Sequence, residues 1–229
     1  MNASCIDDVI ASSVNKFGPV TQQHGVDLWL GEGALHSNSG VNGITNTFVS
    51  SLWYAHTLGQ LARTGVGMLS RQTLLGGDYE LINRTTGAPN PDFYVALLWH
   101  DLVGSEVLNV TMESDCLRNG TDPTGECAES LRVHAHKGSA NNSRRGSTVV
   151  VVLINFSNKS AFSVDLSSSG LQNGEQWQLR GHPHADQIFF NDKPLVYDAH
   201  SGGVPVMKPK PVSSLQLPPC SVTFVEFER

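Results

Sequence analysis

The stretch VDLWLGEGA, residues 26–34, decides how the chain is interpreted. It is a short apolar run that ends in a carboxylate and is followed by a Gly-, Ser- and Asn-rich loop, residues 37–43. An apolar run of this length between turn-forming residues predicts a strand buried on both faces. In parallel sheets covered by helices, active sites lie at the C-terminal ends of the strands. We therefore interpret Glu32 as a candidate catalytic carboxylate, with a helix cap or a surface ion pair as the alternative.

The first hundred residues alternate between helical and extended patterns. Helical apolar spacing occurs at 7–17, 44–62 and 90–102, and the apolar runs 26–33 and 66–75 lie between these segments. This alternation predicts βαβ units with a parallel sheet. Two strands alone leave both edges of a sheet open, so we expect this half to be incomplete by itself.

After Gly104 the pattern changes to short β-rich runs separated by Gly, Ser, Asn and Pro. The runs are 106–112, 131–136, 148–156, 162–166, 176–179, 187–190 and 222–227. Several short strands without helices between them predict an antiparallel β-sandwich. Residues 149–154 are apolar at both alternating positions, and we place them in its core. The predicted domains are 1–104, which is α/β, and 105–229, which is all-β.

Composition and motifs exclude several classes of function. A net charge of −6 without long basic runs argues against a nucleic-acid partner. The four cysteines show no metal-binding spacing, and no nucleotide-binding fingerprint follows a strand, so we expect neither a metal nor a cofactor. The pairs His134/His136 and His182/His184 lack further ligands at local spacing, and we interpret them as solvated or strand-face histidines.

Seven Asn-x-Ser/Thr sequons suggest passage through the secretory pathway, although biased composition is the alternative. They are at Asn2, Asn83, Asn109, Asn119, Asn141, Asn155 and Asn158. Residues 1–11 do not form a signal peptide, because they contain two aspartates and no basic residue. We therefore expect the chain to be the C-terminal part of a longer protein. Cys116 and Cys127 bracket a polar loop and are candidates for a disulfide.

A second candidate segment follows the second strand. Gln72 lies near the end of that strand, and Gly76-Gly77-Asp78-Tyr79 comes directly after it. A glycine pair allows the backbone to approach a ligand closely. Because parallel strands end on the same rim of a sheet, we expect this segment to lie near Glu32.

These segments resemble the heparanase-like proteins, glycoside hydrolase family 79, and most of all the plant-type heparanase-like β-glucuronidases. The matching motifs are LWLGE at 28–32, NSG at 38–40, FVxSxWYxxxLG at 48–59, RQTLxGGxY at 71–79, PNPDxYxxLLWHxLxG at 89–104 and LRVxAH at 131–136. The resemblance implies a (β/α)₈ barrel followed by a β-sandwich, of which this chain would hold the C-terminal portion of the barrel and the sandwich. It further implies a retaining hydrolase acting on β-glucuronide linkages in glycans or glucuronides.

By this resemblance Glu32 is the nucleophile at the end of barrel strand seven. Asn38 and Ser39 match the loop that contacts the sugar, Gly77 and Tyr79 match the segment that holds the glucuronate carboxylate, and Gln72 lies below that segment. Asp78 also lies there, but it replaces the usual Asn and would place a negative charge beside a carboxylate site.

The second carboxylic acid of a retaining site lies upstream in the family, so an upstream half of the barrel would be needed to complete the site. The resemblance and the sequons imply a secreted, lysosomal, vacuolar or membrane-associated protein, and peripheral association with a membrane or cell wall is a further expectation. A degenerate relative that binds glycans without cleaving them is the alternative function.

Overall fold

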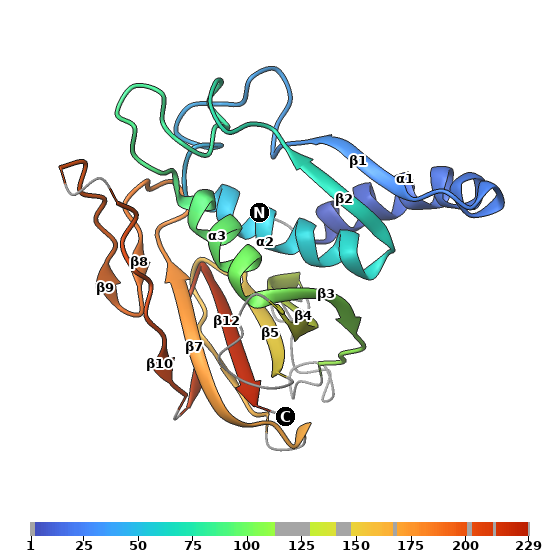
Figure 1. Cartoon of the computed structure of the whole chain (residues 1–229). Coiled ribbons are helices and arrows are strands. Elements are labelled where there is room, and N and C mark those ends of the chain that lie inside the picture. Colours follow the sequence, from blue (N-terminus) through green and yellow to red (C-terminus); the bar gives the residue numbers. More distant parts are fainter. Residues whose placement is uncertain are drawn as a thin grey trace.

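The computed structural model describes residues 3–112, 129–140, 148–166, 169–200, 203–212 and 214–228. Its first part alternates helix and strand, as the sequence predicts (Figure 1). The elements are α1 (Ala3–His24), β1 (Leu28–Gly33), α2 (Phe48–Arg63), β2 (Val66–Arg71) and α3 (Pro91–Leu102). The strands β1 and β2 form a two-stranded parallel sheet.

Helix α1 is longer than the sequence predicts. The predicted helical pattern covers 7–17, but the helix begins at Ala3 and continues through Pro19 to His24. Proline lacks a backbone donor, and the side chain of Thr21 adds a bond in this turn by donating to the Gly18 carbonyl at 2.9 Å. No helix in the described part of the chain is both long and apolar enough to cross a membrane.

The second part of the chain is built almost entirely of strands. They are β3 (Val103–Leu108), β4 (Leu131–Gly138), β5 (Thr148–Asn155), β6 (Phe162–Val164), β7 (Gln172–Arg180), β8 (Phe189–Phe190), β9 (Lys193–Pro194), β10 (Lys210–Pro211), β11 (Leu215–Leu217) and β12 (Ser221–Glu228). Seven of them form a sheet in the order β3-β4-β5-β12-β7-β8-β9, with β10 paired to β7, and all these pairings are antiparallel. The sequence did not predict β9, β10 or β11, which have two or three residues each and therefore show no alternation.

Strand β5 lies inside this sheet, between β4 and β12, and all eight of its residues are buried. Val150, Val152 and Ile154 face a core shared with α2 and α3. The intervening Val149, Val151 and Leu153 face a second core, which the small sheet β6–β11 covers. Apolar residues at both alternating positions are thus explained by two apolar layers, and the predicted core position of this run is confirmed.

Helices α2 and α3 lie between the β1–β2 sheet and the large antiparallel sheet (Figure 1). A loop from the large sheet closes the N-terminus of α2, because the Pro183 and Ala185 carbonyls accept the Val49 and Phe48 amides at 2.8 and 2.9 Å. The Thr47 hydroxyl also donates to the Pro183 carbonyl, at 2.9 Å. These bonds satisfy donors that would otherwise lack partners at the first turn.

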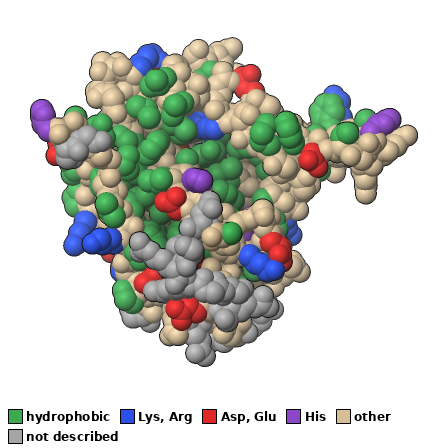
Figure 2. Space-filling model, viewed as in Figure 1, with side chains coloured by type: hydrophobic (Ala, Val, Ile, Leu, Met, Phe, Trp, Pro, Cys, Tyr) green, Lys and Arg blue, Asp and Glu red, His purple; other side chains and the backbone are tan. Residues whose placement is uncertain are grey.

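The prediction that β1 is buried on both faces is wrong for this chain. The side chains of Trp29 and Met68, which are neighbours in the register of β1 and β2, are 60% and 38% exposed. One face of the two-stranded sheet packs on the helices, while the other has no layer against it within the described residues. Hydrophobic side chains gather over this part of the molecule, and the arm made by the end of α1 and the start of β1 projects beyond its body (Figure 2).

Candidate active site

Glu32 reaches the rim of the β1–β2 sheet through a bulge. Leu30 pairs with Leu69 and Gly33 pairs with Arg71, so three steps along β1 match two steps along β2. The extra residue changes the alternation of side chains between the two faces. Strict alternation would place the Glu32 side chain on the same face as Leu30. The bulge changes this alternation, and the Glu32 carboxylate contacts the side-chain amide of Gln72.

Gln72 connects Glu32 to Tyr79. The backbone amide of Gln72 donates to the Gly33 carbonyl at 2.9 Å. This bond places Gln72 beside the end of β1, where Glu32 lies. The side-chain amide is assigned so that its nitrogen faces the carboxylate, because the opposite orientation would place oxygen against oxygen. It then donates to Glu32 Oε1 at 2.5 Å and accepts from the Tyr79 hydroxyl at 2.9 Å. The peptide bond between Gln72 and Thr73 is cis.

Two loops join closely beside this group. The Asp78 amide donates to the Ser39 carbonyl at 2.5 Å, and the Thr45 hydroxyl donates to the Asp78 carbonyl at 2.6 Å. A Cβ on Gly40 would lie 2.9 Å from the Tyr79 nitrogen, and one on Gly77 would lie 2.9 Å from the Ser39 oxygen. Both glycines have positive φ, 84° and 78°, so the contact between the loops depends on them for space and for conformation.

The structure brings the predicted site residues to one rim. Glu32, Asn38 and Ser39 are exposed, whereas Gln72, Gly77 and Asp78 are half-buried and Tyr79 is buried. Asn38 and Ser39, in the loop that follows the strand carrying Glu32, adopt left-handed conformations with φ of 53° and 67°. Asparagine tolerates this region better than most residues, and here the turn directs the loop toward Asp78.

A buried ion pair, which the sequence analysis did not predict, lies beneath this rim. Arg71 donates to Asp92 Oδ2 at 2.6 Å and to the Tyr79 carbonyl at 2.9 Å. Ser50 also donates to Asp92, at 3.0 Å, and the Arg71 guanidinium lies 5.5 Å from the ring centroids of Trp53 and Tyr54. Both aromatic residues are buried in the core. The pair links β2, α2 and α3, and through the Tyr79 backbone it supports the loop at the rim.

A second polar network was also missed, because its members come from distant segments. Of the two predicted alternatives, solvated or strand-face, the structure has the second: His134 lies on β4, is buried, and its Nε2 lies 3.1 Å from His56 Nδ1. His56 Nε2 lies 2.9 Å from the Asp7 carboxylate, which also accepts from Arg132 at 2.9 Å. Burial is the main reason that the pKa of His134 falls to about 3, and the positive charges of neighbouring groups add to the effect.

Other predicted features do not add to the site. His182 and His184 lie in the loop that closes the N-terminus of α2, with ring centroids 5.9 Å apart. Among the described residues, no group of three or more histidine, cysteine or acidic side chains could hold a metal ion.

Cys116 and Cys127 lie outside the described residues, so their predicted disulfide stays a prediction. Cys220, which is free and buried, donates to the Ser157 carbonyl at 3.5 Å.

The fold is shared with glycoside hydrolases. A family 30 xylanase, Xyn30A, from Clostridium acetobutylicum aligns with 92% of this chain and 45% of its own, with a TM-score of 0.54 and 17% identity. An arabinofuranosidase structure aligns with 90% of this chain and 44% of its own, with a TM-score of 0.60 and 14% identity. At these identities the likeness concerns the fold alone.

The sequence comparisons identify a narrower group. Heparanase-like protein 1 of Arabidopsis thaliana is 40% identical over 151 residues, and baicalin-β-D-glucuronidase of Scutellaria baicalensis is 32% identical over 171 residues. These alignments cover 64% and 74% of this chain but only 24% and 29% of the relatives. Inactive heparanase-2 of Homo sapiens is 25% identical over 95% of this chain and 38% of its own length. No protein-family model matches the sequence. The chain is a homologue of the heparanase-like proteins that spans roughly a quarter to two fifths of their length.

Proposed function

We propose that this chain carries the nucleophile half of a retaining glycoside hydrolase that cleaves β-glucuronide linkages. The observation that carries the proposal is the placement of Glu32 at the C-terminal end of β1, with Gln72 donating to its carboxylate at 2.5 Å. In this mechanism Glu32 attacks the anomeric carbon while the leaving oxygen is protonated, and water then releases the glycosyl group from the enzyme. Gln72 orients the carboxylate, and Tyr79 fixes the Gln72 amide.

The second carboxylic acid of such a site must lie about 5–5.5 Å from the nucleophile. The buried acidic residues of the rim are already engaged. Glu80 accepts the backbone amides of Gly76 and Arg84, and Asp92 accepts from Arg71 and Ser50. We propose that the acid/base residue belongs to a segment outside these 229 residues.

The open face of the β1–β2 sheet supports the same proposal. Trp29 and Met68 form an apolar surface that in a (β/α)₈ barrel would lie inside the closed sheet. The remaining strands of a barrel would pair with the two free edges and cover these side chains. The domains would then be the end of a barrel, residues 1–104, and a β-sandwich, residues 105–229.

Covalent labelling tests the proposal directly. The chain is joined to the upstream segment of heparanase-like protein 1, and the hybrid is treated with a 2-fluoro-glucuronyl fluoride, which traps the glycosyl-enzyme. Peptide mapping should find the label on Glu32 and should find none in Glu32→Gln. Asp27→Asn, at the other end of the strand region, is the matched carboxylate control and should label normally.

The 229-residue chain alone should not hydrolyse an aryl β-glucuronide. Turnover by the isolated chain that disappears in Glu32→Gln would show that a complete site is present and that the two-part site is wrong. Label on another carboxylate of the hybrid would remove Glu32 from the nucleophile role.

A second candidate function is glycan binding without hydrolysis. One observation favours it: the Asp78 backbone amide donates to the Ser39 carbonyl, so an acidic residue lies in the segment proposed to hold the glucuronate carboxylate. Like charges at short range oppose binding. An active hybrid whose KM falls in Asp78→Asn would support hydrolysis with weakened glucuronide specificity, whereas a hybrid that binds glucuronide oligosaccharides without turnover would support this second function.

A further inference from the structure

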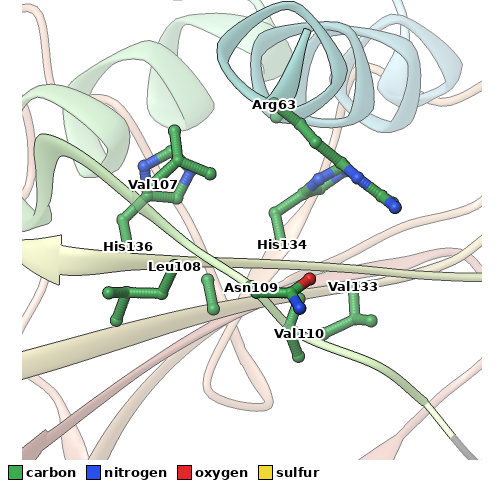
Figure 3. Close-up of a pocket in the computed structure, with 10 residues that line it drawn as sticks. Arg63, Val107, Leu108, Asn109, Val110, Val133, His134 and His136 are labelled. Atoms are coloured by element: carbon green, nitrogen blue, oxygen red, sulfur yellow. The ribbon is translucent and has the colours of Figure 1, made fainter.

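A cavity of about 300 Å³ lies between α2, β3 and β4, and none of its lining residues belongs to the loops around Glu32 (Figure 3). Its volume is at the lower end of the range for small-molecule sites. Its polar lining comes from Arg63 at the end of α2, Asn109 after β3, and His134 and His136 of β4. All these elements are contained in this chain, so the cavity does not depend on an upstream segment.

His136 is the first sign that the cavity accepts a ligand. It is 2% exposed, and neither ring nitrogen makes a well-formed hydrogen bond. The Gly104 backbone lies close enough to raise the pKa of the ring, but burial has the larger effect and lowers this pKa overall. Trp99 packs against the ring edge-on, with centroids 5.4 Å apart. A buried polar group without a partner is costly and calls for a group that would satisfy it.

His134, in contrast, is held firmly in place. A Cβ on Gly59 would lie 2.2 Å from its ring, so this glycine makes room for the ring against α2. Asp7 lies beside His56 Nε2, which places a proton on that nitrogen, and His56 Nδ1 then faces His134 Nε2 at 3.1 Å. His134 Nε2 is engaged in this contact, and His134 Nδ1 takes no part in it.

The remaining lining combines one cation with apolar surface. Arg63 is exposed at the mouth, and in Figure 3 its guanidinium lies beside the His134 ring. Val107, Val110 and Val133 supply apolar surface, and no acidic side chain is among the described residues that line the cavity. A site with one guanidinium, imidazole and amide groups and an apolar wall matches a small organic anion with an apolar body.

We propose that this cavity binds a small carboxylate. Arg63 would hold the carboxylate oxygens, and His136 and Asn109 would complete the hydrogen bonds. The valines would cover the apolar body of the ligand.

Such binding should strengthen as the pH falls, because a bound anion favours the protonated form of the neighbouring imidazoles. The groups that face His134 are His56 and Arg63 from α2, Asp7 from α1 and His136 from its own strand. From β3, the facing residues Val107 and Leu108 carry no charge. Protonation of His134 therefore depends on the ligand charge to offset the positive neighbours.

Titration of the full chain with benzoate, glucuronate and sulfate tests the site, with imidazole proton shifts observed by NMR. Protein from a bacterial host is used so that Asn109, which lies in a sequon, carries no glycan. Benzoate should saturate with a Kd on the order of 1 mM, tighter at pH 5 than at pH 7, and should shift the signals of His134 and His136. Arg63→Gln should weaken binding by about tenfold, while Arg84→Gln, a remote arginine, should leave it unchanged.

The anions distinguish the possible ligands. Benzoate binding tighter than sulfate shows that the apolar wall takes part, and glucuronate binding tighter than benzoate identifies a uronic acid as the carboxylate. The proposal is overturned if no anion saturates, if sulfate equals benzoate, or if the two arginine variants behave alike. His136→Gln, which keeps a polar side chain, should weaken binding while preserving the circular dichroism spectrum; unchanged binding would also contradict the site.

Discussion

The side-chain amide of Gln72 donates to the Glu32 carboxylate at 2.5 Å across the ends of two parallel strands. The two residues are forty positions apart in the sequence, and the bulge in β1 brings them together. Tyr79 fixes the amide from the other side, so the orientation of the proposed nucleophile depends on three residues from two loops and a strand.

Replacement of Gln72 should impair the chemical step of the hybrid enzyme. Gln72→Met keeps the length of the side chain but removes the donor, and we expect kcat to fall by about tenfold to a hundredfold because the carboxylate loses its fixed orientation. Gln72→Glu should also move the acidic limb of the pH profile of kcat/KM upward, since a second carboxylate raises the pKa of its neighbour. An acidic limb that stays in place would show that Gln72 does not act on Glu32.

The buried pair of Arg71 and Asp92 should be sensitive to loss of either partner. Asp92→Ala leaves an uncompensated guanidinium whose side chain is 5% exposed, and we expect the free energy of unfolding to fall by about 3–5 kcal/mol. The double variant Arg71→Met/Asp92→Leu should recover most of this loss. Urea unfolding measures both effects.

Arg84→Gln is the matched control for this pair. Arg84 lies 3.5 Å from Glu80 with 53% of its side chain exposed, so its removal should cost about 1 kcal/mol or less. A similar loss in Asp92→Ala and Arg84→Gln would mean that the buried pair contributes no more than a surface one.

His134 should make the protein less stable in acid. Its pKa is about 3 in the folded chain and is expected to be near 6.5 when unfolded, so the unfolded state binds more protons between these values. Stability should therefore decline as pH falls from about 6.5 toward 3, by up to about 5 kcal/mol. His134→Gln should flatten this decline in urea unfolding series, whereas His200→Gln, at an exposed position, should not.

The Asp7 carboxyl acts in a lower pH range. Burial opposes its ionisation, but the hydrogen bonds and charges of His56 and Arg132 lower its pKa overall. A group with a lowered pKa stabilises the fold above its unfolded pKa, and this contribution is lost only as pH falls below about 4. A decline of equal size in His134→Gln and the unaltered chain would assign the acid sensitivity to groups other than His134.

Asn155 should remain without a glycan although it lies in a sequon. Its side chain is fully buried, and its Nδ2 donates to the carbonyls of Ser160, Leu217 and Pro218 at 2.8–3.1 Å. A glycan on this nitrogen would break these bonds and could not fit inside the fold. Asn158, three residues later, is exposed and is the expected acceptor. Peptide mass spectrometry of protein secreted from a eukaryotic host should find glycan on Asn158 and none on Asn155.

Asn155→Asp should destabilise the fold by about 1–3 kcal/mol, because it removes the amide donor that three backbone carbonyls share. Asn158→Gln should remove the glycan with little change in stability. Glycan found on Asn155 in folded protein would contradict this packing.

The sequence by itself determined the local elements and the position of Glu32. Apolar spacing predicted the three helices and two parallel strands, and the glycines and polar residues at the strand ends predicted a shared rim that carries Glu32, Gln72 and Tyr79. The doubled apolar pattern of residues 149–154 likewise predicted a strand with apolar layers on both faces. These features are encoded by neighbours along the chain, so periodicity and turn chemistry are enough to find them.

Tertiary structure alone decided how these residues work together. The bulge after Leu30 turns Glu32 toward Gln72, and the Arg71–Asp92 pair supports the Tyr79 loop from beneath. The contact of Asp7, His56 and His134 joins three segments that no sequence motif connects. The position of Glu32 depends on strand register. The two polar networks depend on side chains from distant segments that lie close together in the interior, where a buried polar group needs a hydrogen-bonding partner. Local sequence carries no signal for such distances, and only the packed chain determines them.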